Sequence, residues 1–421
     1  MWKRTITNSF IVLGGAILSR LFIFLYNILI IRKLTVFEYA NFALLNSILI
    51  WTLVFSHGDL YAAVSKYVSE KNTQGKFGEA WDYYKNGVII VMALSLIGIF
   101  ISILFSFSVK VNIFVQIAFF SSLIPLALLT INDGLFKGHE KFKFSALVDT
   151  CNGFSKFIIL FLFLIIIGNL NLEKALIIFA IASLFPFLLS NTLTRLLNQK
   201  KYINEWKLNK SIINKLIPYS IWVCLTDLLN TGTFLFTNYV LAFFSSDDLA
   251  QFSVVILIYS IFQICFGSIT TVLIPQVSRQ VANGERINLL GFKELSFLTI
   301  ITIVIVIIIY FFPYNREIIE YVFNKKFYNE SYKYVAFLLL TLSLRIFSMI
   351  NKGIVQGLNN PKAIAFSAFS TFLINSILLI PLYRLLGIWG VILSLNIAFI
   401  AEFIFNYMAA IRTLRDTIYG V

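Results

Sequence analysis

Long, continuous runs of apolar residues dominate the chain, and short polar segments separate them. Most of these runs are close to the length of about 20 residues that a helix needs to cross the hydrocarbon core of a bilayer. The apolar residues do not alternate with polar ones, so membrane-spanning strands are excluded. The pattern predicts an all-α polytopic membrane protein of about 12 transmembrane helices. The runs cover residues 10–31, 39–57, 87–109, 113–135, 144–167, 175–196, 218–244, 250–273, 295–312, 334–357, 363–383 and 387–411.

Composition supports the same class. Hydrophobic residues make up 59% of the 421 residues and charged residues 13%, whereas soluble domains have about 45–50% apolar and about 25% charged residues. A soluble globular enzyme, a disordered chain and a disulfide scaffold are therefore excluded. The 3 cysteines all lie in apolar runs without metal-ligand spacing. We expect no cofactor.

The net charge of +14 is explained by membrane topology and not by nucleic-acid binding. With the N-terminus in the cytoplasm, 22 of the 34 Lys and Arg residues fall in or beside cytoplasmic segments and 9 in external loops. This bias predicts that both termini are cytoplasmic. The external segment 313–333 is the exception because it carries 4 basic residues. It is either an amphipathic surface helix or a sign that the run 295–312 does not cross the membrane.

Two short motifs recur along the chain. Ala40-Asn41-Phe42 matches Ala250-Gln251-Phe252, and the GxxxG motif Gly134–Gly138 matches Gly353–Gly357. The spacing predicts two six-helix lobes, residues 1–200 and 201–421. Because six is even, both lobes enter the membrane from the same side and form a parallel repeat with a pseudo-two-fold axis. Substrate sites of such proteins lie between the halves, near the membrane midplane.

Polar and charged side chains inside the runs are the candidate functional residues. A charge at the centre of a membrane helix costs roughly 2.5–3.5 kcal/mol on insertion scales, so it should face protein or a watery cavity. Arg20 and Arg345 lie near mid-span, and a guanidinium offers a fork of donors suited to phosphate. The predicted substrate-binding residues are Arg20, Arg345, Asn27, Asn238, Gln263 and Lys352. The predicted residues for coupling to protons or a cation are Asp227, Asp149 and Glu402.

Ordinary helix packing is the alternative role for many of these positions. The two GxxxG motifs are predicted to be packing faces. Asp149 and Lys156 could neutralise each other within the helix 144–167, Asp227 could pair with an arginine, and Glu402 could be a packing partner.

The sequence shows no arrangement typical of an enzyme. His57 and His139 have no partners at metal spacing, and no GxxxxGK[ST] phosphate loop or nucleophile constellation is present. We therefore predict that the protein is not an enzyme and that it binds no metal.

Several segments together resemble bacterial lipid-linked oligosaccharide flippases, the O-antigen and capsule repeat-unit flippases of the multidrug, oligosaccharidyl-lipid and polysaccharide exporter superfamily. The segments are Ser19-Arg20, Arg32-Lys33-Leu34, Glu38 to Phe42, Ala62 to Tyr67, Gly134 to Phe142, Asp227 and Gly387 to Gly390. The resemblance implies an undecaprenyl-pyrophosphate-linked oligosaccharide as the substrate, in the bacterial cytoplasmic membrane. It also implies a task, the movement of the sugar head group from the cytoplasmic to the outer leaflet. We expect alternating access by rocking of the two six-helix lobes, coupling to a proton or cation, polysaccharide polymerases as partners and no nucleic acid.

Three other functions are consistent with parts of the pattern. A multidrug or organic-cation antiporter of the same superfamily would favour carboxylates in the cavity. A major-facilitator sugar transporter is disfavoured because Gly58-Asp59-Leu60 is not followed by a basic pair. A membrane polysaccharide polymerase is disfavoured because the external loops are short.

Overall fold

The computed structural model describes residues 2–107, 109–197, 206–262, 292–323, 328, 330–358 and 360–419. These residues are almost entirely helical, and no strand occurs among them. The predicted all-α class is therefore confirmed. The N-terminal half contains α1 (Trp2–Lys33), α2 (Val36–His57), α3 (Leu60–Thr73), α4 (Phe77–Ser106), α5 (Ile113–Ser121), α6 (Leu123–Gly138), α7 (Phe142–Ile167) and α8 (Leu172–Leu197).

After α9 (Lys210–Phe244), the chain is again helical over residues 246–262. The remaining helices are α11 (Phe292–Phe311), α12 (Asn315–Phe323), α13 (Ser331–Leu339), α14 (Leu342–Gly357), α15 (Pro361–Leu386) and α16 (Ile388–Tyr419).

Nine of the described helical segments are long and apolar enough to cross a membrane, and two bent pairs raise the number to 11. The bent pairs join α11 to α12 at 79° and α13 to α14 at 48°. Each of these segments overlaps one of the predicted runs. The remaining predicted run, 250–273, is helical up to residue 262 and continues outside the described residues. The protein is thus a multi-pass membrane protein.

The second span is longer than the apolar pattern predicted. The run 39–57 ends together with α2 at His57. The helix α3 then follows after two residues in the left-handed region, Gly58 (φ 52°) and Asp59 (φ 49°). The two helices form one 38-residue segment, Val36–Thr73. The extension is polar on one side, while its other side buries Ala63 and Val64 against α4 and α6. Hydropathy alone does not detect a helix of this kind.

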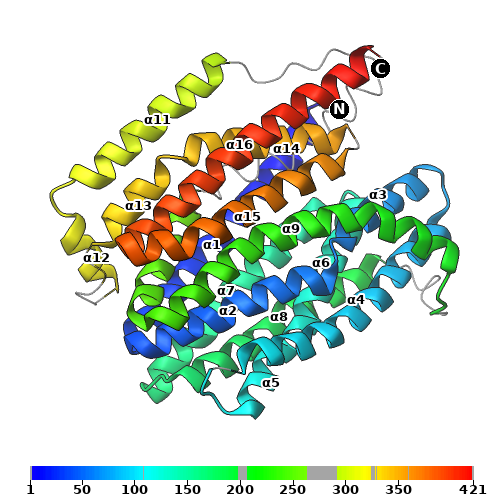
Figure 1. The fold of residues 1–421 in the computed structure, drawn as a ribbon. Helices are drawn as coiled ribbons and strands as arrows, with labels where there is room; N and C mark the ends of the chain where they lie inside the picture. The colour runs from blue at the N-terminus through cyan, green and yellow to red at the C-terminus, as the bar shows by residue number, and fades with distance from the viewer. Residues whose placement is uncertain are drawn as a thin grey trace. The chain divides into compact units, whose positions relative to one another are not determined.

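The chain forms two compact units, Met1–Leu228 and Leu229–Val421, which we call the N-terminal and C-terminal units. In the N-terminal unit α1 packs on α7, α7 on α8, and α3 on α4 and α6. In the C-terminal unit α16 packs on α14 and α15, and Figure 1 shows α15 and α16 side by side. The predicted lobe boundary at 200/201 lies in the segment 198–205, outside the described residues, and stays a prediction.

The order of helix lengths supports the predicted internal repeat. α5 and α13 each have 9 residues, α6 and α14 each have 16, and α7 and α15 each have 26. The two 16-residue helices end on the second glycine of each GxxxG motif. The helices that follow begin at Phe142 and at Pro361, so each begins at the same distance along the chain from the glycine that precedes it.

The glycines of the first motif are packing positions, as predicted. A Cβ atom on Gly134 would lie 2.5 Å from the Tyr61 carbonyl oxygen, and one on Gly138 would lie 2.7 Å from the Val68 side chain. The absence of side chains lets α6 contact the backbone of α3. Within the segment 313–333, α12 is amphipathic, because Ile319 and Phe323 are buried while the Arg316 side chain is 63% exposed. That this helix lies on the outer surface of the membrane stays a prediction.

Candidate functional site: charged side chains within each unit

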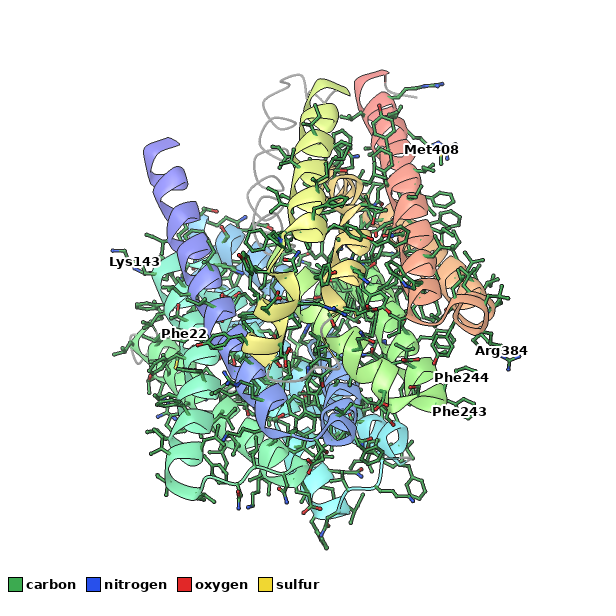
Figure 2. All side chains as sticks on the ribbon, turned by 90° about the vertical axis from the view of Figure 1, so that its left-hand side faces the viewer. Phe22, Lys143, Phe243, Phe244, Arg384 and Met408 are labelled. Atoms are coloured by element: carbon green, nitrogen blue, oxygen red, sulfur yellow. The ribbon has the colours of Figure 1, made fainter. Side chains whose placement is uncertain are left out.

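Arg20 lies on an exposed face of α1, where α1 makes its tightest contact with α7. The contact depends on Gly153 of α7, because a Cβ atom there would lie 2.2 Å from the Ser19 carbonyl oxygen. Phe22, which is labelled in Figure 2, continues the interface on the next turn of α1. Its ring centroid lies 5.2 Å from that of Phe154 on α7. The backbone of α1 is therefore held against α7 directly beside Arg20.

A group of charges at the α6–α7 interface lies within electrostatic reach of Arg20. Lys137 Nζ is 2.6 Å from Asp133 Oδ2, and the Ser145 hydroxyl donates a hydrogen bond to Asp133 Oδ1. Asp149 interacts electrostatically with Asp133, Lys137 and Arg20. The structure thus places the predicted coupling residue Asp149 in a four-charge group: Arg20, Asp133, Lys137 and Asp149.

Lys156 does not belong to this group, and the suggestion that it neutralises Asp149 is wrong. Among the described residues no ion pair joins the two side chains. Lys156 Nζ instead lies 4.3 Å from the centroid of the Phe179 ring on α8. Seven residues separate Asp149 from Lys156, which places them about 10 Å apart along the helix axis at about 1.5 Å per residue.

Asp227, the other predicted coupling residue of the N-terminal unit, lies on α9 close to the turn between α2 and α3. It interacts electrostatically with His57 and Tyr61. His57 Nδ1 accepts a hydrogen bond from the Asp59 backbone N–H at 3.1 Å and lies 3.5 Å from Asp59 Oδ1. The α9 helix is fixed there by Trp51, whose indole Nε1 donates to the Leu228 carbonyl oxygen at 3.1 Å.

Tyr61 connects these two charged groups. Its hydroxyl interacts electrostatically with Asp59, Asp227 and Asp133, and Lys137 Nζ lies 5.8 Å from its ring centroid. Charged side chains therefore extend from Arg20 to Asp227 within one unit. Sequence reasoning missed Asp133, Lys137 and Tyr61. The spacing of four residues between Asp133 and Lys137, which allows an ion pair on one helix face, was the available signal.

In the C-terminal unit, two predicted site residues form one ion pair. Arg345 Nη1 on α14 lies 3.4 Å from Glu402 Oε2 on α16, and the guanidinium carbon is 3.9 Å from the centroid of the Phe399 ring. Lys352 lies partly buried on the same helix as Arg345.

The predicted amide side chains have different surroundings. Asn27 donates from Nδ2 to the Ile23 carbonyl oxygen of its own helix at 2.8 Å. Asn238 is buried on α9 beside Thr237, whose hydroxyl accepts a hydrogen bond from Asn375 at 3.2 Å. Asn375 also accepts one from Ser394 at 3.0 Å, so α9, α15 and α16 share a neutral polar network. Gln263 lies outside the described residues.

No group of three or more His, Cys, Asp or Glu side chains that could hold a metal ion occurs in the part of the chain that the structure describes. Among the described residues, the charged groups of both units consist of Arg, Lys, Asp and Glu side chains and His57, together with aromatic rings. Such groups bind ions and polar ligands and transfer protons.

The overall architecture is that of solved multidrug transporters. An inward-facing multidrug resistance MATE family transporter of the MOP superfamily aligns with a TM-score of 0.74 at 12% identity, over 97% of this chain and 98% of that chain. An outward-facing structure of such a transporter gives a TM-score of 0.72 at 13% identity, over 99% and 96%. The MATE transporter VcmN of Vibrio cholerae gives 0.62 at 14% identity, over 98% and 99%.

The chain therefore has the fold of the MATE transporters of the MOP superfamily. The family model described as polysaccharide biosynthesis protein matches residues 5–281, and the MatE model matches residues 223–380. Because the first match covers more than half of the chain, the protein belongs to the polysaccharide biosynthesis protein family. No match was found among curated proteins.

Proposed function

We propose that the protein flips undecaprenyl-pyrophosphate-linked oligosaccharide repeat units from the cytoplasmic to the outer leaflet of the bacterial cytoplasmic membrane. The lipid tail stays in the bilayer while the diphosphate and the sugars cross. The two six-helix lobes alternate between inward-open and outward-open states, and both termini are cytoplasmic. The released repeat units then serve a polysaccharide polymerase.

The observation that carries this proposal is the match of the polysaccharide biosynthesis family to residues 5–281. The chemistry of the N-terminal unit supports it. Placing a charge inside a membrane costs roughly 2.5–3.5 kcal/mol on insertion scales, and such residues mark substrate and ion pathways. Arg20 and Asp149 lie within spans of this unit, and Asp133 and Lys137 lie at the end of one. We therefore expect Arg20 and Asp149 to have a function that offsets the cost of burying them.

Arg20 and Arg345 contact the diphosphate in this proposal, and Asn27, Asn238, Gln263 and Lys352 contact sugar hydroxyls or phosphate oxygens. Glu402 has a specific part because it lies 3.4 Å from Arg345. Protonation of Glu402 removes the partner of the guanidinium and frees it for a phosphate oxygen. Asp149 and Asp227 exchange protons or a cation in the N-terminal unit.

A multidrug or organic-cation antiporter is the second candidate. The MatE model matches residues 223–380, and two of the similar solved structures are described as multidrug resistance transporters. An antiporter of this type would use Asp149, Asp227 and Glu402 to bind a cationic substrate, with Arg20 and Arg345 as their resting partners.

Reconstitution distinguishes the two. Proteoliposomes would carry a polyprenyl diphosphate with a fluorescent saccharide, and dithionite added outside would quench the accessible label. The proposal expects that the protein exposes the label of the inner leaflet and that Arg20→Ala abolishes this exposure. Unchanged protection of the inner-leaflet label, together with export of ethidium from cells that express the protein, would establish the antiporter instead.

A further inference from the structure

A buried ammonium group in the N-terminal unit has no anionic partner in the part of the chain that the structure describes. Lys156 on α7 is 9% exposed, and none of the ion pairs among the described residues includes it. Its Nζ lies 4.3 Å from the centroid of the Phe179 ring. A desolvated cation–π contact contributes about 2 kcal/mol or somewhat more, whereas removing an ion from water costs several kcal/mol. The ring therefore offsets only part of the cost of burying Lys156.

A second polar group without a partner contacts the same ring. Tyr26 on α1 is 2% exposed, and its ring centroid lies 6.5 Å from that of Phe179. The Tyr26 hydroxyl is fully buried and has no hydrogen-bond partner among the residues that the structure describes. A buried hydroxyl without a partner costs about 1–3 kcal/mol. An ammonium and a hydroxyl that both lack an acceptor among the described residues thus pack on the same aromatic ring.

The surroundings favour an anion as that acceptor. Arg20 on α1 acts electrostatically on Lys156, and the two like charges repel. An oxyanion would reduce this repulsion and would accept hydrogen bonds from both Lys156 and Tyr26. The amide of Asn152, one turn before Lys156 on α7, also has a buried Oδ1 without a partner among the described residues, and exchanging the amide oxygen and nitrogen would make it a donor at this position.

We propose that the N-terminal unit contains an oxyanion-binding site formed by Lys156 Nζ and the Tyr26 hydroxyl against the Phe179 ring, with Arg20 at its exposed edge. The ligand is a phosphate, a diphosphate or a carboxylate. This anionic group belongs to a lipid-linked diphosphate, an acidic sugar or an anionic lipid headgroup. The site shares Arg20 with the group of Asp133, Lys137 and Asp149, but no carboxylate of that group forms an ion pair with Lys156 among the described residues. Its assignment to the lipid-linked diphosphate rests on the proposed function, whereas the binding of an oxyanion rests on the contacts within this unit.

The test compares variants in nanodiscs of neutral lipid, with inorganic pyrophosphate and glucuronate as probes. Each probe is added separately, and the apparent melting temperature and the Kd are measured. Lys156→Met should weaken pyrophosphate binding by about ten- to one-hundred-fold, which corresponds to the loss of a charged hydrogen-bonding group. Lys156→Arg should retain most of the binding, and Tyr26→Phe should weaken it by a smaller factor.

The matched control is Lys143→Met, the same substitution on the same helix. Lys143 is exposed and extends from the surface of α7 (Figure 2), so this variant should bind both probes like the wild type. Nanodiscs containing phosphatidylglycerol identify the lipid headgroup as the source if they alone raise the melting temperature of the wild type but not of Lys156→Met. A response to pyrophosphate only, or to glucuronate only, identifies the diphosphate or the acidic sugar.

The melting temperature of the ligand-free protein distinguishes a binding role of Lys156 from a purely structural one, because loss of a structural lysine would lower it. Lys156→Met removes an uncompensated buried charge and should raise the melting temperature of the ligand-free protein. Two results overturn the proposal. One is a wild type that responds to no probe in either lipid; the other is a Lys156→Met variant that binds the probes with wild-type affinity. Because no transport is measured, a failure of the flippase proposal leaves the outcome of this experiment unaffected.

Discussion

Arg345 and Glu402 form a buried ion pair between α14 and α16, with Arg345 Nη1 3.4 Å from Glu402 Oε2 and side chains only 13% and 9% exposed. The Phe399 ring covers the guanidinium, and the Arg345 Nε atom has no hydrogen-bond partner within the described ranges. The free-energy cost of burying each charge is therefore lower when the other charge is present. Helices α14 and α16 pack extensively on each other, so the ion pair also affects the stability of the C-terminal unit.

Removal of one member of this pair should destabilise the protein more than removal of both. Arg345→Met leaves the Glu402 carboxylate buried without a counter-charge, and breaking a buried pair in this way costs about 3–5 kcal/mol. In Arg345→Met/Glu402→Gln no charge is left, so most of the lost stability should return. Apparent melting temperatures of the single and double variants in nanodiscs measure this coupling. Additive losses would mean that the two residues do not depend on each other.

Arg20→Ala should abolish surface polysaccharide while the protein still inserts at normal levels, because the proposed diphosphate contact is lost. Arg20→Lys should restore only part of the polymer, since an ammonium cannot replace a bidentate guanidinium. Arg32→Ala is the matched control, because Arg32 is an exposed arginine at the end of the same helix. Immunoblotting of surface polymer and of the protein in membrane fractions gives both readouts. Normal polymer in the Arg20→Ala strain would exclude Arg20 from the site.

The transmembrane architecture could be predicted because hydropathy is a property of each segment by itself. The positions of the runs, the packing role of Gly134 and Gly138 and the similarity of the two halves all follow from local patterns. The extension of the second span by α3 could not be found in this way. Its apolar residues Ala63, Val64 and Val68 occupy one face of an otherwise polar helix, and only their partners on α4 and α6 make that face a buried one.

The pairing of charges was less predictable because it depends on helix rotation and on which helices are neighbours. Arg345 and Glu402 are 57 residues apart and were assigned separate roles, but the packing of α14 on α16 joins them. Asp133 and Asp149 are brought together in the same way by the packing of α6 on α7. Lys156 was matched with Asp149 because they share a helix, yet the structure places Lys156 on an aromatic ring.

Reporter fusions should read opposite sides of the membrane on either side of α9. Lys207 precedes this helix and Asp247 follows it, and the helix is long and apolar enough to cross the bilayer. A fusion of green fluorescent protein after Lys207 should fluoresce, as expected in the cytoplasm. Alkaline phosphatase fused after Asp247 should be active, as expected outside. The reverse activities would invert the orientation predicted from the Lys and Arg bias.

The stability of the protein should decrease as the pH falls below about 6.5, in part because of His139. This residue lies between α6 and α7, where burial and the nearby Lys141 charge lower the pKa of its imidazole below the ordinary value of 6.5. The unfolded chain therefore binds a proton at a higher pH than the folded protein does, and stability present above pH 6.5 is lost on acidification. His139→Gln should flatten the melting temperature between pH 8 and pH 5. An unchanged slope would assign the pH dependence to other groups.

Gly153→Ala and Gly14→Ala should have opposite effects on the stability of the protein. Each substitution adds one methyl group to a helix of the α1–α7 pair. The Cβ atom of the first would lie 2.2 Å from the Ser19 carbonyl oxygen, and backbone cannot move aside as a side chain does. Overpacking of this kind costs about 1–3 kcal/mol. At Gly14 nothing lies within 4 Å of the added atom, so the better helix propensity of alanine should stabilise by up to about 1 kcal/mol.

The same pair of variants also links the helix contact to the Lys156 site. Lys156 follows Gly153 on α7, and Tyr26 and Arg20 lie on α1, so a separation of the two helices would widen the distance between the groups proposed to hold the oxyanion. Pyrophosphate should therefore bind more weakly to Gly153→Ala and equally well to Gly14→Ala. If Gly153→Ala loses stability but binds pyrophosphate with wild-type affinity, the ligand does not bridge α1 and α7, and Lys156 would have to hold it without Tyr26.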